Sequence, residues 1–138
     1  MTAMKTKILV IAIIYKDDAV LLRKKPEGSE PYEQTWYLFG GELTDGQAPE
    51  EAVAETLRLQ AGIEVRFSEA LAWDTEVKAD HDGEVKQFVY LDARFEYVSG
   101  EIKAGEGIEK VEWAPISRLG EYDHVPPSAK LFRKLGYI

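Results

Sequence analysis

Apolar runs separated by turn-forming residues predict a chain of short strands around one central helix. Residues 7–15 form a nearly unbroken run of β-branched and other apolar side chains, which is typical of a strand buried on both faces. A polar turn at 16–18 leads to a second predicted strand at 19–24. Two longer strand-like segments, 65–77 and 85–98, are joined by residues that include an Asp-Gly pair, so we expect a hairpin there.

A helix is predicted between these strands at 49–61. Pro49 suits the first helical position, two glutamates follow it, and Gly62 supplies a stop. Further elements are expected as a strand entering a glycine turn at 36–41, a short strand at 110–113, a helical turn at 115–119 and a final helix at 127–135. Strands on both sides of one helix, followed by a terminal helix, predict an α+β fold, an α/β/α sandwich around a central mixed sheet. No internal repeat or linker divides residues 1–138, so we expect a single domain.

Composition narrows the classes of function. Of the 138 residues 45% are hydrophobic, which is enough for a proper core. The net charge of −8 argues against broad binding to nucleic acid or to an anionic membrane, because both need a concentrated basic surface. The absence of cysteine rules out disulfides and thiol chemistry and fits a reducing cytoplasm. The N-terminal apolar run is too short to span a bilayer and has no small-residue cleavage site. We therefore expect a cytoplasmic protein.

The most informative stretch is residues 36–63, WYLFGGELTDGQAPEEAVAETLRLQAGI. It resembles the loop–helix–loop of the Nudix hydrolases, whose signature is G-x5-E-x7-R-E-U-x-E-E-x-G-U, where U is a bulky aliphatic residue. Four of the nine defined positions match, namely Gly41, Leu57, Gly62 and Ile63. The other five carry Gln47, Glu55, Thr56, Leu59 and Gln60. The segments AVLLRKK, GEIKAGEGIEKVEWAPISRL and PPSAKLF follow the family's order of elements, so the resemblance extends through most of the chain.

The resemblance implies a helix that holds Mg²⁺ or Mn²⁺ against a substrate diphosphate. Positions 56, 59 and 60 share one helix face, where carboxylates of active relatives hold the metal. The metal activates water and offsets charge on the leaving phosphate. Here Thr56, Gln60 and Gln47 offer only neutral oxygens, and Leu59 offers none. We therefore expect metal binding at this helix, and hydrolysis with it, to be weak or absent.

Other acids on the same helix leave a second interpretation open. Glu51 and Glu55 are four residues apart, so a shifted metal site is geometrically conceivable. The favoured interpretation is a solvated helix face, in which acids near the first turn complement the helix dipole and Glu55 pairs with Arg58.

Candidate substrate contacts lie on either side of the helix. By resemblance, Arg23 at the end of a strand is expected near substrate phosphates, although it also suits a polar strand end. The backbone N–H groups of Gly40 and Gly41 could approach an anion, or these glycines could serve only the turn. Glu106 and Glu109 lie where some relatives carry a catalytic base or an extra metal ligand, and the alternative is a solvated acidic loop.

Aromatic and histidine side chains complete the candidates. Five aromatic residues could stack on a nucleobase or could belong to the core, namely Trp36, Tyr37, Trp73, Phe88 and Tyr90. The two histidines, His81 and His124, have no second histidine at ligand spacing, so zinc is not expected.

Three functions follow from these alternatives. The first is a pyrophosphohydrolase that cleaves the diphosphate of a nucleoside diphosphate linked to another group, here weakly or not at all. The second is a non-catalytic module that binds a nucleotide as a sensor or in protein interaction. The third is a structural remnant with neither property. The expected partner is a small nucleotide or nucleotide derivative, and a homodimer is possible because oligomers are common in the family.

Overall fold

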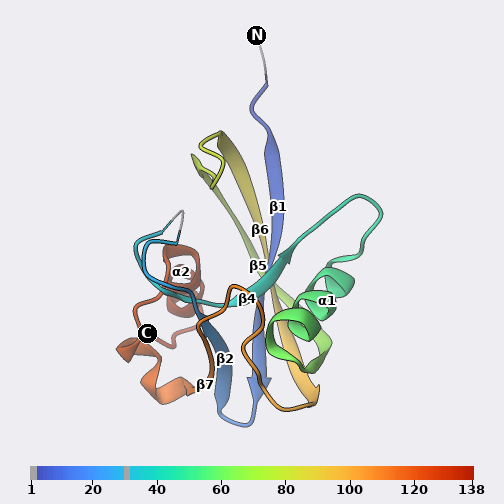
Figure 1. Ribbon diagram of the computed structural model, residues 1–138, viewed down its shortest axis with the longest axis vertical. Coiled ribbons are helices and arrows are strands. Elements are labelled where there is room, and N and C mark those ends of the chain that lie inside the picture. Colours follow the sequence, from blue (N-terminus) through green and yellow to red (C-terminus); the bar gives the residue numbers. More distant parts are fainter. Residues whose placement is uncertain (1–2, 30–31) are drawn as a thin grey trace.

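The computed structural model describes residues 3–29 and 32–138. Its elements are β1 (Thr6–Lys16), β2 (Ala19–Lys24), β3 (Trp36–Tyr37), β4 (Phe39–Glu42), α1 (Pro49–Ala61), β5 (Glu64–Ala79), β6 (Val85–Ser99), β7 (Lys110–Pro115), a 3-10 helix (Ile116–Glu121) and α2 (Pro126–Lys134). Figure 1 shows α1 and α2 on either side of the strands. The predicted α/β/α sandwich around a mixed sheet is confirmed.

The sheet opens between two of its strands, and this opening positions the candidate site. β1 pairs with β6 in parallel, while the other pairs are antiparallel. β1 and β2 pair only beside their connecting turn, through Tyr15–Val20 and Lys16–Ala19. Beyond that point β1 pairs with β4, and β2 pairs with β3. The short β3–β4 segment therefore lies between strands that would otherwise be neighbours.

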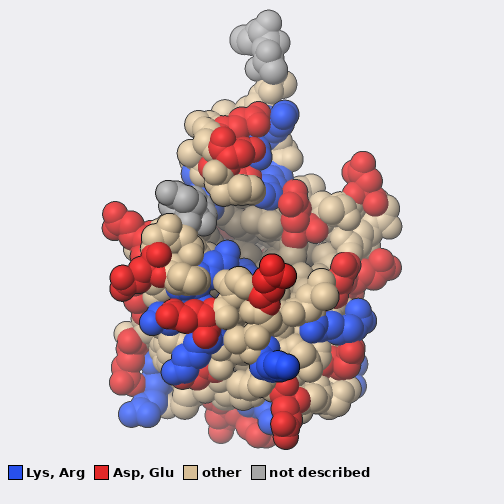
Figure 2. Space-filling model, in the orientation of Figure 1, with Lys and Arg blue, Asp and Glu red and all other residues tan. Residues whose placement is uncertain are grey.

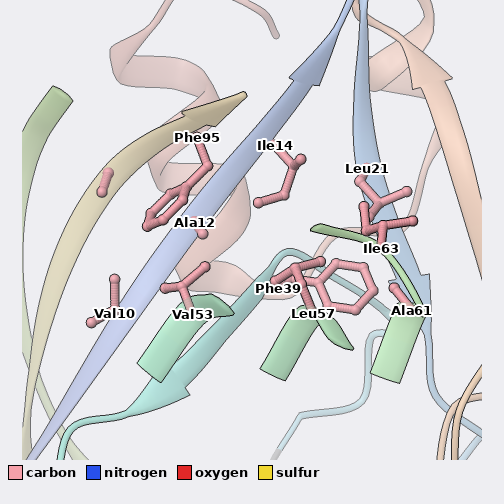
Figure 3. Packing of buried hydrophobic residues seen from close by; sticks show 11 residues of the cluster. Val10, Ala12, Ile14, Leu21, Phe39, Val53, Leu57, Ala61, Ile63 and Phe95 are labelled. Carbon is pink, nitrogen blue, oxygen red and sulfur yellow. The ribbon is translucent and has the colours of Figure 1, made fainter. Parts of the chain in front are cut away.

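Two cores lie on opposite faces of β1, because successive side chains of a strand point to opposite faces. Val10, Ala12 and Ile14 pack with residues of α1 and with Phe39 of β4 (Figure 3). The alternate positions pack toward α2, where the buried cluster includes Ile13, Tyr15, Leu131 and Phe132. Burial on both faces explains the unbroken apolar run in this strand.

Helix α1 has the expected ends and one unexpected ion pair. It begins at Pro49, and Gly62 adopts a left-handed φ of 73° with its N–H donating to Leu57 O. The predicted pair between Glu55 and Arg58 is wrong. Arg58 Nε lies 3.0 Å from an oxygen of Glu64, because β5 starts directly after the helix and brings that carboxylate back to it. Glu55 instead accepts a hydrogen bond from Gln47 Nε2 at 3.2 Å.

Within residues 3–29 and 32–138, no helix combines the length and the apolar character that a membrane span requires.

Candidate functional site

A cavity of about 330 Å³ lies where the sheet opens, beside β1 and the β3–β4 segment. Its walls come from β1, β2, the β3–β4 segment, the β5–β6 hairpin and the start of α2. In the view of Figure 2 the molecule is hollowed near its middle. The polar and aromatic side chains that line the cavity include Lys7, Arg23, Lys25, Tyr32, Tyr37, Phe39, Lys78, Asp80, His81, Phe88, Tyr90 and Ser128. Gly40 and Gly41 also line it.

Arg23 enters the cavity from the end of β2. Its Nε donates to Leu38 O at 3.1 Å, and its Nη1 donates to Gln60 Oε1 at 2.6 Å. The guanidinium carbon lies 5.5 Å from the ring centre of Tyr37 and 5.4 Å from that of Phe39. Burial lowers the pKa of Arg23 to about 10, so the group is still charged at neutral pH. Among the described residues no carboxylate lies within 4 Å of this guanidinium.

Lys25 lies near Arg23 and, like it, has a lowered pKa and no described carboxylate nearby. Its Nζ lies 4.6 Å from the ring centre of Tyr37, on which Arg23 also packs. Burial, and then the charge of Arg23, lower the pKa of Lys25 to about 8. The part of the chain that the structure describes offers no carboxylate within 4 Å of Lys25 either. This end of the cavity therefore carries two positive charges that no described carboxylate pairs with.

The hydroxyl of Tyr37 is a buried polar group without a described hydrogen-bond partner. The side chain is 8% exposed, and its hydroxyl has no hydrogen-bond partner within residues 3–29 and 32–138. Buried polar atoms are usually paired, so this hydroxyl marks a second unmet interaction at the end of the cavity that holds Arg23.

The opposite end is neutralised by Asp80. Its Oδ2 lies 3.0 Å from Lys7 Nζ and 2.9 Å from Lys86 Nζ, and its Oδ1 accepts from the backbone N–H of His81 at 2.8 Å. Burial alone would raise the pKa of Asp80, but these donors hold it well below its ordinary value. The carboxylate ties the tip of the β5–β6 hairpin to β1.

Lys78 is neutralised in the same wall. Its Nζ lies 3.2 Å from Glu76 Oε1 and 4.1 Å from the ring centre of Tyr32, whose hydroxyl it also contacts. The hydroxyls of Tyr90 and Tyr32 donate to Glu76 Oε1 at 2.7 Å and 2.8 Å. Burial lowers the pKa of Lys78, although Glu76 opposes this. Phe88 stacks 6.3 Å from Tyr90, which makes this end aromatic as well as neutral.

The expected glycine turn is wrong, because Gly40 and Gly41 lie within β4, which pairs with β1, and both pack too closely for other residues. A Cβ on Gly40 would overlap the carbonyl oxygen of Val10 in β1. A Cβ on Gly41 would lie 2.9 Å from Ala52 O and 3.0 Å from Thr56 Oγ1 of α1. Both glycines are therefore required by the fold, and both also lie against the cavity.

The polar side chains at the signature positions in and just before α1 are engaged in hydrogen bonds within the protein. Thr56 Oγ1 donates to Ala52 O at 3.0 Å, one turn back along the helix. Gln60 Oε1 accepts from Arg23, and Gln47 donates to Glu55. Leu59 is 70% exposed to solvent.

Comparison with known proteins settles the family. A model of the NUDIX domain matches residues 5–135. The chain belongs to the NUDIX family. It is 26% identical over 141 residues to the nucleoside triphosphatase NudI of Escherichia coli O17:K52:H18, and the match covers 98% of this chain and 100% of NudI.

Solved structures agree on the fold. A MutT protein from Methanosarcina mazei Go1 aligns over 97% of this chain and 95% of its own, with a TM-score of 0.79 and 18% identity. A NUDIX hydrolase from Nitrosomonas europaea aligns over 96% of this chain and 89% of its own, with a TM-score of 0.76 and 18% identity. At these identities the likeness establishes the NUDIX fold alone.

NUDIX proteins generally use Mg²⁺ or Mn²⁺, but the side chains at this helix do not fit such an ion. Mg²⁺ needs oxygen ligands with negative charge among them. The amide oxygen of Gln60 is occupied by a guanidinium, and the hydroxyl of Thr56 is turned to the helix backbone. Glu51 and Glu55, the alternative pair, are exposed. Within the described ranges 3–29 and 32–138, no group of three or more His, Cys, Asp or Glu could hold a metal ion.

Glu106 and Glu109 lie outside the cavity lining. The loop that carries them packs on the end of α1, where the N–H of Gly105 donates to Gln60 O at 2.9 Å. Glu109 lies 3.8 Å from Lys24 Nζ. The structure therefore brings Arg23, Gly40 and Gly41 to one cavity, and it does not place these two acids with them.

Some of the aromatic and histidine candidates line the cavity, and others lie outside it. Tyr37, Phe88 and Tyr90 line the cavity, whereas Trp36 packs edge-on against Tyr122 and Trp73 is 80% exposed. His124 is buried with Nε2 2.7 Å from Leu119 O, and His81 lies at the cavity beside Asp80.

Several residues of the cavity wall are not singled out by the sequence, among them Lys7, Tyr32, Lys78 and Asp80. The available signal was the alternation of β5 and β6, which places Lys78 on the same face as Phe88 and Tyr90. Only the pairing of β6 with β1, with β5 on the far side of β6, brings this face to the cavity that Arg23 lines.

Proposed function

We propose that this NUDIX protein binds a small nucleotide or nucleotide derivative in the cavity, and that it hydrolyses the diphosphate weakly or not at all. The observation that carries the proposal is the positive charge of Arg23 and Lys25 at one end of the cavity, where no carboxylate of residues 3–29 and 32–138 lies within 4 Å of either group. Arg23 and Lys25 are partly buried, and partly buried charges without a carboxylate among the described residues cost stability, so a bound anion is the simplest source of compensation. A chain of net charge −8 could otherwise have supplied a carboxylate.

The two ends of the cavity suit the two parts of a nucleotide. Phosphates fit beside Arg23, Lys25 and the backbone of Gly40, where a guanidinium can bind oxygens in pairs. The base fits on the side of the cavity that Phe88 and Tyr90 line, where the cations are paired with carboxylates, although these two residues are only 2% and 4% exposed. The similarity to a nucleoside triphosphatase supports the same class of ligand.

Weak or absent hydrolysis follows from the charges that α1 lacks. Positions 56, 59 and 60 carry no carboxylate, and the donors that are present contact other protein groups. Glu106 and Glu109 remain candidate general bases by position in the chain. Either one alone would contribute little, because a general base needs a correctly placed water to act on.

Two measurements test this proposal. Phosphate release is followed for nucleoside triphosphates, ADP-ribose, dinucleotide polyphosphates and nucleotide sugars, each with Mg²⁺ and with Mn²⁺. Thermal unfolding is then measured with the same compounds, because ligand binding to the native state raises its stability. A stabilising shift without turnover supports a binding module, whereas brisk turnover of any of these compounds contradicts it.

A variant that restores glutamate at four positions isolates the cause. Gln47, Thr56, Leu59 and Gln60 are changed together to glutamate. Gained metal binding by calorimetry, with gained turnover, would show that missing carboxylates alone keep the wild-type protein inactive. Persistent inactivity of a folded variant that binds metal would place the defect elsewhere in the cavity.

The remaining expectations stay predictions. Homodimerisation is checked by light scattering coupled to size-exclusion chromatography. Cytoplasmic location and the lack of nucleic-acid or membrane binding rest on composition and charge.

A further inference from the structure

Gln60 links α1 to the guanidinium of Arg23 in the cavity. Its Oε1 accepts from Arg23 Nη1 at 2.6 Å, across 37 residues of sequence. Backbone carbonyl groups next to this contact also accept hydrogen bonds. Leu38 O receives the Nε of Arg23, and Gln60 O receives the N–H of Gly105. A Cβ on Gly105 would lie 2.9 Å from Gln60 Cα, so the loop packs directly on this residue.

The chemistry of the amide matters at this distance. A neutral amide oxygen accepts one hydrogen bond and leaves the full charge of the guanidinium available. A carboxylate at the same place would form a charge-assisted pair with Arg23 and would compensate its charge internally. Position 60 corresponds to a glutamate in the family signature, so the amide changes the charge of the site while it keeps the length of the side chain.

We propose that the guanidinium of Arg23, held in place by Gln60, takes over the counter-charge that a divalent cation provides to the phosphates in this family, so that ligand binding does not require a metal. Gln60 is then a positioning residue, and Arg23 is the group that touches the phosphates. This inference rests on the proposed nucleotide binding. It adds that the absence of carboxylates at positions 56, 59 and 60, and the absence of a described carboxylate beside Arg23, form one arrangement.

Three features of the cavity support this arrangement. The rings of Tyr37 and Phe39 pack on the guanidinium at 5.5 Å and 5.4 Å, which limits its freedom. Lys25 adds a second charge within the same cavity. Gly41 of β4 packs on α1 beside Thr56. This contact fixes the position of β4 relative to the helix that holds Arg23.

The experiment compares two changes at one position by calorimetric titration of inorganic pyrophosphate and of ADP, in EDTA and in Mg²⁺. Wild-type protein is expected to bind in EDTA with an affinity within about threefold of that in Mg²⁺. Gln60→Glu keeps a hydrogen-bond acceptor but compensates Arg23, so its affinity in EDTA should fall by roughly tenfold or more. Gln60→Met keeps the length and loses the acceptor without adding charge, so its affinity should fall by less, about twofold to fivefold.

The order of these two variants separates charge from structure. If Gln60 served only to support the fold, the isosteric Gln60→Glu would bind as wild type and Gln60→Met would be the weaker. That order would overturn the inference. Gln87→Glu is the matched control, because Gln87 is exposed on β6 and lies outside the cavity lining, so its affinity should equal that of wild type. Thermal unfolding of each variant confirms that it is folded.

The wild-type result also separates this inference from the proposed function. Binding that appears only with Mg²⁺ would overturn the metal-independent site and leave nucleotide binding standing. No binding in either buffer would overturn both.

Discussion

The cations at one end of the cavity are paired with carboxylates, and those at the other end are not paired with any described carboxylate. Lys7 and Lys78 lie within 3.2 Å of Asp80 and Glu76, whereas no described carboxylate comes within 4 Å of Arg23 or Lys25. Burial is common to both ends, so burial alone does not explain the difference.

The contrast distinguishes stability from function. A buried cation with a carboxylate and further hydrogen bonds joins strands together, as Asp80 joins the hairpin to β1. A buried cation without one costs stability, and perturbed groups of this kind concentrate at functional sites. The two ends should therefore respond differently when a charge is removed.

The largest effect is expected at the neutralised end. Asp80→Ala leaves Lys7 and Lys86 without a partner and removes several hydrogen bonds. The free energy of unfolding should fall by about 1.5–3 kcal/mol, measured by urea denaturation at neutral pH. The pKa of Asp80 is held below its ordinary value of 3.8, so its contribution is present above that pH and is lost as the pH falls below it.

The wild-type and Asp80→Ala proteins should accordingly converge in stability in acid. Asp82→Ala is the control, because Asp82 also contacts Lys86, at 2.9 Å, but is exposed, and little change is expected from it. Equal destabilisation by both variants would contradict the central place of Asp80.

At the other end, Arg23→Met should act on binding more than on stability. The loss of a guanidinium that binds phosphate should weaken ADP affinity roughly tenfold to a hundredfold, about 1.4–2.8 kcal/mol, by calorimetry. The free energy of unfolding should change less than in Asp80→Ala, because removal of an unpaired buried charge offsets the lost hydrogen bonds to Leu38 and Gln60. A large loss of stability with unchanged affinity would reverse the comparison.

Lys25 should make binding depend on pH. Its pKa of about 8 means that its charge is lost as the pH rises through that value in the free protein. ADP affinity should therefore fall by about threefold to tenfold between about pH 7 and about pH 9.5. Lys25→Arg should keep its affinity over this range because arginine stays charged. The same pH dependence in both proteins would assign it to another group.

The smallest effect is expected from a single hydroxyl at the aromatic end. Tyr90→Phe removes the hydrogen bond to Glu76 and keeps the ring. The free energy of unfolding should fall by about 1 kcal/mol, while ADP affinity should stay within about twofold of wild type. Thermal unfolding and calorimetry on the same sample check both values. A strong loss of affinity would show that the hydroxyl itself contacts the ligand.

Local signals in the sequence were sufficient for the elements. The helix at 49–61 was predicted with its observed bounds, because Pro49 and Gly62 act on the backbone within one turn. The predicted ion pair of Glu55 with Arg58 is wrong because it considered contacts within the helix alone. Spacing along a helix shows which side chains can meet, but a strand that returned to the helix offered Arg58 a better-placed carboxylate in Glu64.

The site was predicted only in part. Arg23, Gly40 and Gly41 were named from the family resemblance, and the structure brings them to one cavity. Lys78 and Asp80 were not named, because nothing near them in sequence indicates that β6 pairs in parallel with β1 and carries β5 beside it.

By itself the sequence determined the strands, the central helix and the absence of carboxylates at positions 56, 59 and 60, since these depend on residue type and short-range spacing. Only the tertiary structure decided which cations are compensated. Charge pairing requires atoms within a few ångströms, and the groups concerned lie as far apart in sequence as Lys7 and Asp80, or Arg23 and Gln60. Folding brings the first two together as an ion pair and leaves Arg23 with a neutral amide.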